Sequence, residues 1–255
     1  MRQSILALLL LVPAVASASG DRCEFHADRN LDLDLAGVHQ VRFTTGSYEL
    51  TVAGNASGAR GSLQGKACAS DQETLDTLVV TQRKDGDVLT VTLGSESRHW
   101  GRNSQYSDLK VSASLPAGVP VRVDVGSGSA TVRNVASLES SVGSGELQGG
   151  DIKGAVRTKV ASGSAHLENV GPLTVDSVAS GEVRVRQVGG DATLGSVASG
   201  SLQLSGVSGS VNAQGVASGS LAVREVKGSL SVGRKGSGDV SYSGIGGKVD
   251  VPQDR

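Results

Sequence analysis

Residues 199–219 read SGSLQLSGVSGSVNAQGVASG and contain one complete unit of a repeat. Apolar residues alternate with polar ones in two short runs of this unit: Leu202, Leu204 and Val207, then Val211, Ala213 and Val216. Alternation with a period of two is typical of a β-strand with one buried face. Glycines separate the two runs, where we expect sharp turns that often need a positive φ. Each unit should therefore form one coil with two short strands.

The same unit recurs along the second half of the chain. A Ser-Gly dipeptide marks each recurrence, with its serine at Ser127, Ser144, Ser162, Ser180, Ser199, Ser218 and Ser237. These serines are 17 to 19 residues apart. A fixed period near 20 residues indicates stacked supersecondary units. We therefore predict an all-β protein, a β-solenoid of stacked coils of 17–19 residues with two short strands per coil. An unstructured Gly/Ser-rich segment is the alternative, but it would not keep Val and Leu in register.

The earlier coils have one residue fewer in their second half, around Val156–Val160. We interpret this difference as a shorter corner that leaves the register intact. Residues 116–255 are assigned to the solenoid. Residues 19–115 contain strand-like runs without helical periodicity, and we expect them to form a β-rich capping region at the N-terminal end. Charges and Pro252 near the C-terminus suit an edge strand protected against further pairing.

Residues 1–18 have the organisation of a secretory signal peptide. A basic start at Arg2 precedes an apolar run from Ile5 to Val12 and a small-residue exit that ends at Ala18. The run is shorter than the roughly 20 apolar residues of a transmembrane helix. We expect an exported protein, periplasmic or extracellular, with no transmembrane segment in the mature chain.

The chain has two cysteines, Cys23 and Cys68. An even number of cysteines in an exported chain favours a disulfide. Two free thiols or a metal site are the alternatives, but zinc needs three or four ligands and no histidine cluster accompanies either cysteine in the sequence. The bond would close a loop of about 45 residues and stabilise the fold by about 3 to 4 kcal/mol.

Composition limits the classes of partner. The 24 basic and 25 acidic residues nearly cancel, which argues against a nucleic-acid partner because phosphate contacts need a basic face. The 36 glycines and 2% aromatic residues indicate a thin structure with an aliphatic core. We expect no cofactor.

No catalytic constellation is apparent in the sequence. The Ser-Gly corners lack recurrent His and Asp partners for nucleophilic catalysis, and none of them has the ending of a phosphate-binding loop. The calcium-binding nonapeptide is also missing. The histidines are scattered without metal-ligand spacing, at His26, His39, His99 and His166. We therefore predict neither catalytic nor metal-binding residues.

The longest break in the strand pattern, residues 95–106, is a candidate binding loop. Its candidate contact residues are Arg98, His99, Trp100, Arg102 and Tyr106. Tryptophan beside arginine is common at binding hot spots. The simpler alternative is a hairpin tip whose tryptophan packs locally. A polar column on the second strand could bind a repetitive surface, although ordinary solvation also explains it: Thr174, Thr193, Asn212, Ser231 and Asp250.

Residues 115–128, LPAGVPVRVDVGSG, and the Gly-Ser-Gly units that follow resemble a known family. Its members are bacterial exported proteins with β-strand repeats, of unknown function and often labelled putative adhesins. The resemblance covers roughly residues 75–251 and implies a β-solenoid and an envelope location.

These features together predict a non-enzymatic, adhesin-like structural or interaction module of the envelope. It would present flat β-faces to an unknown envelope or cell-surface partner, either a protein or a surface. The alternative is a polysaccharide-acting enzyme on a β-helix scaffold, an analogy that rests on the fold alone. Binding to ice or to a glycan surface is a third, weaker hypothesis.

Overall fold

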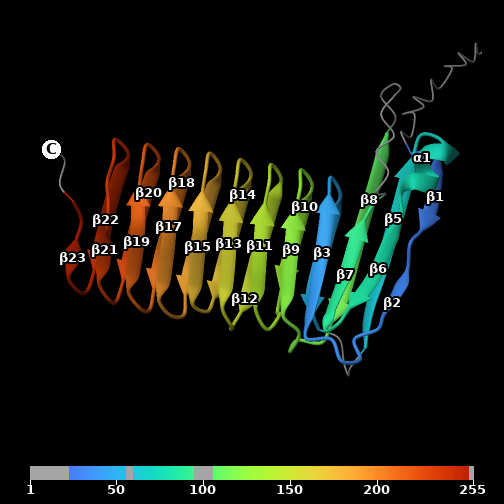
Figure 1. The fold of residues 1–255 in the computed structure, drawn as a ribbon, viewed down its shortest axis with the longest axis horizontal. Coiled ribbons are helices and arrows are strands. Elements are labelled where there is room, and N and C mark those ends of the chain that lie inside the picture. The colour runs from blue at the N-terminus through green and yellow to red at the C-terminus, as the bar shows by residue number, and fades with distance from the viewer. Residues whose placement is uncertain (1–22, 56–59, 95–105, 253–255) are drawn as a thin grey trace, which may run out of the picture.

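The computed structural model describes residues 23–55, 60–94 and 106–252. Apart from one short helix, the regular elements of these residues are β-strands. Figure 1 shows the strands stacked side by side along the long axis, with the C-terminal coil at one end and the N-terminal strands at the other. The prediction of an all-β solenoid is confirmed.

Two parallel sheets run through the repeats. We call sheet A the one whose strands follow the Ser-Gly corners: β10 (Ser129–Arg133), β12 (Glu146–Ile152), β14 (Ser164–Val170), β16 (Glu182–Val188), β18 (Ser201–Val207), β20 (Ser220–Val226) and β22 (Asp239–Ile245). Sheet B contains the second strand of each coil and β9: β9 (Val121–Val125), β11 (Leu138–Val142), β13 (Val156–Val160), β15 (Leu173–Val178), β17 (Ala192–Val197), β19 (Val211–Val216), β21 (Leu230–Val232) and β23 (Val249–Asp250). Between residues 129 and 250 the chain thus makes seven coils, from β10/β11 to β22/β23.

Successive coils stack in register with their repeat positions. Leu202 in β18 pairs with Val183 in β16 and with Leu221 in β20. In sheet B, Leu194 pairs with Val175 and Ala213 in the same way. Equivalent apolar positions therefore form continuous rows between the two sheets, where a fully buried Val or Leu contributes about 1.5–3 kcal/mol.

The corner glycines are needed for close approach between coils. A Cβ atom on Gly200 would overlap the carbonyl oxygen of Gly181 in the preceding coil, and Gly181 meets Gly163 in the same way. The expectation of positive φ at these corners is wrong. Left-handed φ values instead occur at the sixth position counted from the start of each sheet A strand: Asn134, Asp151, Asn169, Gln187, Gly206, Glu225 and Gly244.

The prediction of a shorter corner is wrong for the coil of β12 and β13, where the strand itself is shorter, but it holds for the coil of β14 and β15, whose corner has only Gly171 and Pro172 where the next coil has residues 189–191. Strand β13 has five residues and β15 has six, and their pairing shifts between Thr158 and Lys159. Asp176 is the extra residue, so the strand absorbs the insertion as a bulge. The inner rows remain aligned because Val160 still pairs with Val178.

The parallel stack extends into the N-terminal half. Its strands there are β3 (Gln40–Gly46), β4 (Glu49–Gly54), β7 (Val88–Leu93) and β8 (Ser107–Leu115). β3 and β4 pair with β9 and β10, and β7 and β8 lie beyond them. The sheets are therefore continuous across residue 116, and the division into a cap and a solenoid at that residue stays a prediction.

Antiparallel strands complete the N-terminal end. They are β1 (Phe25–Asp28), β2 (Leu31–Leu33), β5 (Gly61–Ala69) and β6 (Val80–Asp85). β5 pairs with β8, and β6 pairs with β7. Asp71 caps the N-terminus of the helix α1 (Gln72–Thr77), and its carboxylate accepts a hydrogen bond from the Thr74 backbone amide at 2.8 Å. Within the described ranges, no helix has the length and apolar character to cross a membrane.

The C-terminal coil leaves part of its inner row exposed. Tyr242 in β22 pairs with Val223, which is fully buried, so alternation places the tyrosine in the inner row as expected. Its side chain is nevertheless 48% exposed because β22 is the last described strand at this edge of its sheet. The inner row is therefore less covered in the last described coil than in the coils before it.

Candidate functional site

A groove of about 1100 Å³ runs along the corner between the sheet B strands and the sheet A strands. Each coil up to that of β20 contributes a Ser-Gly corner and the first residue of its sheet A strand, such as Ser180, Gly181 and Glu182, and the last coil contributes Asp239. The groove extends from Tyr48 in the N-terminal half to Asp239 in the last coil. It therefore passes every coil of the repeat.

Backbone hydrogen bonds between coils hold the floor of the groove. The amides of Ser180 and Gly181 donate to the carbonyl oxygen of Ala161 at 2.8 and 2.9 Å, and the Glu182 amide donates to Gly163 at 2.9 Å. These bonds occupy the backbone, and the side chains of the corner serines are exposed. Because adjacent strands lie about 4.8 Å apart, the hydroxyls form a regular ladder.

The polar character of the groove comes from hydroxyls and carboxylates. The carboxylates of its lining are Glu49, Asp108, Glu146, Glu182 and Asp239. Some have cationic neighbours, since Arg184 contacts Glu182 at 2.7 Å and Lys110 lies 3.5 Å from Glu49. Tyr48 is the one aromatic residue of the lining, and partial burial raises the pKa of its hydroxyl. The groove suits a polar ligand better than an apolar one.

The outer face of sheet A carries arginines. Arg184, Arg186 and Arg224 surround a shallow hollow of about 250 Å³, which also includes Ser205 and Ala222. Arg186 and Arg224 occupy the same column on either side of Ser205. This face is more basic than the neighbouring groove.

On the outer face of sheet B, opposite charges are paired. Arg42 contacts Asp124 at 2.6 Å, and Arg122 contacts Glu139 at 2.9 Å. A further pair joins Arg157 to the bulge residue Asp176 at 2.7 Å. Such exposed pairs stabilise a fold little. The predicted polar column lies in register farther along: Thr174, Thr193, Asn212, Ser231 and Asp250.

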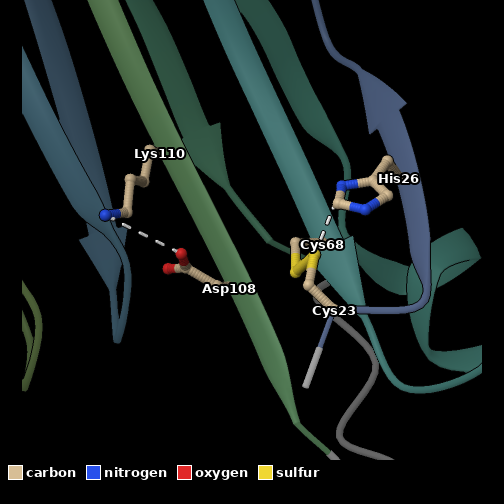
Figure 2. Close-up of a disulfide and its surroundings, with 5 residues drawn as sticks. All are labelled: Cys23, His26, Cys68, Asp108 and Lys110. Atoms are coloured by element: carbon tan, nitrogen blue, oxygen red, sulfur yellow. Dashed lines mark hydrogen bonds and ion pairs between the residues drawn. A yellow bond between two sulfur atoms is a disulfide. The ribbon is translucent and has the colours of Figure 1, made fainter. Parts of the chain in front are cut away.

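The cysteines lie at the N-terminal end. Cys23 and Cys68 form a disulfide, as predicted (Figure 2). His26 in β1 is the cross-strand partner of Cys68 in β5, and its Nδ1 lies 3.2 Å from Cys23 Sγ. Asp108 in β8 pairs with Cys68 on the other side. A single histidine therefore lies beside the two cysteines, whereas the expectation from the sequence concerned only a histidine cluster.

Asp71 has a shifted pKa with a structural cause. Hydrogen bonds from Thr74, first from its backbone amide, lower the pKa of the Asp71 carboxyl. The carboxylate caps the first turn of α1, which explains the shift without any catalytic role.

The predicted binding loop falls mostly outside the described residues. Arg98, His99, Trp100 and Arg102 lie there, so their role stays a prediction. Tyr106 is described and is 38% exposed, and its carbonyl oxygen accepts a hydrogen bond from the Ser70 amide at 3.0 Å. This bond ties the end of the segment to the sheet.

Sequence reasoning missed the groove, although its signal was present. The recurring Ser-Gly dipeptide marks the coil period and also brings each serine hydroxyl to the same corner. Treating these dipeptides only as turns concealed the surface that they form together.

A family model described as Toastrack DUF4097 matches residues 30–251. The chain belongs to the Toastrack DUF4097 family. The match includes both sheets and most of the N-terminal strands, as the resemblance of residues 115–128 implied. The name fits the row of coils in Figure 1. No curated protein matches this Toastrack chain.

Three solved structures match most of this Toastrack chain. One, from Parabacteroides distasonis, is called a "putative lipid binding protein"; it has 19% identity and a TM-score of 0.54, over 85% of this chain and 96% of that one. A "putative adhesin" from the same species has 13% identity and a TM-score of 0.44, over 88% and 97%. A "putative adhesin" from Bacteroides fragilis has 14% identity and a TM-score of 0.40, over 90% and 99%. The first similarity supports the fold, and the other two carry no structural argument.

Proposed function

We propose that this Toastrack protein is a non-enzymatic interaction module of the bacterial envelope. It holds an extended polar partner along the Ser-Gly groove and the flat β-face beside it. The observation that carries this proposal is the continuity of the groove, which receives serine hydroxyls or a carboxylate from each coil. A repeated row of weak contacts suits a long partner, because contacts along one chain gain from their high effective concentration.

The rigidity of the groove supports this function. Its floor is backbone held by hydrogen bonds between coils, such as Ser199 to Ala179 at 2.7 Å and Ser201 to Gly181 at 3.0 Å. A surface that is already ordered loses little conformational entropy when a partner binds. Names of similar solved structures, putative adhesins and a putative lipid-binding protein, are compatible with a surface module.

Export is part of the proposal. The predicted signal peptide at residues 1–18 would direct the chain out of the cytoplasm. The Cys23–Cys68 disulfide suits an oxidising compartment, either the periplasm or the extracellular space.

A polysaccharide-acting enzyme is the alternative, and the form of the coils argues against it. The corners between sheet A and sheet B are short, as in Ser208–Ser210 between β18 and β19. They provide no loops to enclose a substrate, whereas enzyme sites usually bury most of a ligand. The groove carboxylates Glu146 and Glu182 belong to coils separated by a third, whose equivalent residue is Ser164.

Site-specific photo-crosslinking tests the proposal. A photoreactive residue replaces Ser180 in the groove or, as a matched control, Thr193 on the outer face of sheet B. We expect crosslinks to envelope material from position 180 and few from position 193. Equal crosslinking from both positions, or from neither, would refute the groove as the contact surface. Depolymerisation of envelope polysaccharide by the purified protein would support the enzyme instead.

A further inference from the structure

Three metal-ligating side chains meet at the N-terminal end of the solenoid. Among the residues that the structure describes, Cys23, His26 and Cys68 are the group whose sulfur and ring nitrogen atoms all lie within 4.8 Å of one another. Cys23 and Cys68 are partly buried, and His26 is exposed. Figure 2 shows the imidazole beside the disulfide, on the strand next to Cys68.

The sheet holds two of these ligands in place. His26 and Cys68 are direct cross-strand partners in the antiparallel pair β1–β5, and β5 is held on its other side by β8. Cys23 lies three residues before His26, and its Sγ is 3.2 Å from His26 Nδ1. The disulfide therefore leaves an imidazole nitrogen beside both sulfur atoms.

We propose that reduction of the Cys23–Cys68 disulfide converts this cluster into a zinc site with two thiolates and one imidazole. Zinc bonds to sulfur at about 2.3 Å and to histidine nitrogen at about 2.0–2.1 Å, so tetrahedral ligand atoms lie roughly 3.5 Å apart. The ligand atoms of the cluster all lie within 4.8 Å of one another, close to this spacing. The three ligands leave the fourth position open to water or to an external ligand.

The conversion balances with a dithiol as the reductant. The dithiol transfers two electrons and two protons to the disulfide, so that the Sγ–Sγ bond breaks, two thiols form and the reductant becomes a disulfide. Zinc then displaces the two thiol protons, which pass to the solvent. Oxidised and metal-bound forms exclude each other, because each sulfur atom is either in the disulfide or available as a thiolate.

Zinc uptake by the mature full-length protein tests the proposal. The protein is reduced with dithiothreitol under anaerobic conditions, desalted, incubated with Zn²⁺ and desalted again before the metal is measured. We expect about one zinc per reduced chain and almost none in the oxidised protein. Replacing zinc by Co²⁺ should produce the thiolate-to-cobalt absorption and the intense visible bands of a tetrahedral site.

Single substitutions assign the ligands. Mutation of a residue that only hydrogen-bonds to a zinc ligand weakens metal binding by up to about 100-fold. His26→Ala removes a direct ligand, so it should weaken zinc binding by at least about 100-fold. Cys23→Ser should weaken it similarly. His39→Ala is the matched control, because His39 is also exposed but bonds to Asp87 at 3.3 Å, outside the cluster.

Three results would overturn the proposal. They are zinc uptake by the oxidised protein equal to that of the reduced protein, no uptake after reduction, and wild-type affinity in His26→Ala. Circular dichroism of each reduced sample checks that its β-structure persists. If reduction unfolds the sheet, zinc must restore it in the wild type and fail to do so in His26→Ala, and any other pattern rejects the site.

Discussion

The corner glycine Gly200 offers a specific test of how the coils stack. A Cβ atom at this position would overlap the carbonyl oxygen of Gly181 and lie 2.7 Å from Val178 Cγ1. That carbonyl accepts the hydrogen bond from the Ser201 amide at 3.0 Å, so it cannot move without weakening the contact between coils. Gly200→Ala should therefore force β16 and β18 apart locally.

The expected cost has two parts. Overpacking of an ordered interior costs about 1–3 kcal/mol. Loss of one intercoil hydrogen bond adds about 0.5–1.5 kcal/mol. We therefore expect Gly200→Ala to lower the free energy of unfolding by about 2–4 kcal/mol.

Urea unfolding followed by circular dichroism measures this difference. The midpoint should fall while the slope with denaturant stays the same. Gly118→Ala is the matched control, because a Cβ atom there meets nothing within 4 Å, and its effect should stay within about 0.5 kcal/mol. Equal midpoints for the two variants would refute the argument that close approach between coils requires glycine.

Three further predictions concern other parts of the chain. Leu202→Ala should lower the free energy of unfolding by about 2–5 kcal/mol, measured in urea, because the Leu202 side chain is 1% exposed. Tyr242→Ala should lower it less, because Tyr242 is 48% exposed, and the reverse order would contradict the described core. Reduction of Cys23–Cys68 should lower the free energy of unfolding by about 3–4 kcal/mol, and an unchanged urea midpoint would show that closing this loop does not stabilise the fold. The pKa of Asp71 is lowered in the folded state, so the carboxylate stabilises the fold above its unfolded pKa, and this contribution is lost as pH falls through the folded pKa. Asp71→Ala should therefore destabilise the protein at about pH 7 but no longer at about pH 2. Thermal melts that show the same difference at both pH values would exclude the carboxylate as the cause.

Alternation along the repeats was enough to predict the strands and their stacking. Leu202 and Leu204 mark the inner positions of β18, and the 19-residue spacing of Ser-Gly from Ser180 onward predicts which residues of neighbouring coils pair. The same regularity could not show how a coil absorbs a length change. A residue missing from the period can reflect a shorter corner or a strand without a bulge, so locating the bulge at Asp176 required the observed pairing.

Contacts outside the repeats were less predictable. In the sheets, β3 and β4 lie between β7/β8 and β9/β10, whereas in the sequence β7 and β8 come after β4 and before β9. No periodicity specifies such an order. His26 was missed for a related reason, because its place beside Cys68 depends on the β1–β5 register. The left-handed backbone at residues such as Asn134 and Gln187 could not be predicted, because glycine is the usual sequence signal for a positive φ and these residues are not glycine.

The affinity of groove variants for native envelope material tests the proposed function most directly. Ser162→Arg combined with Ser180→Arg fills the groove, whereas Thr193→Arg combined with Asn212→Arg adds the same two charges to the exposed face of sheet B. We predict that the groove variant loses at least about tenfold in affinity, or about 1.4 kcal/mol, and that the sheet B variant binds like the wild type. Equal affinities for all three proteins, or a loss confined to the sheet B variant, would contradict the assignment of the groove.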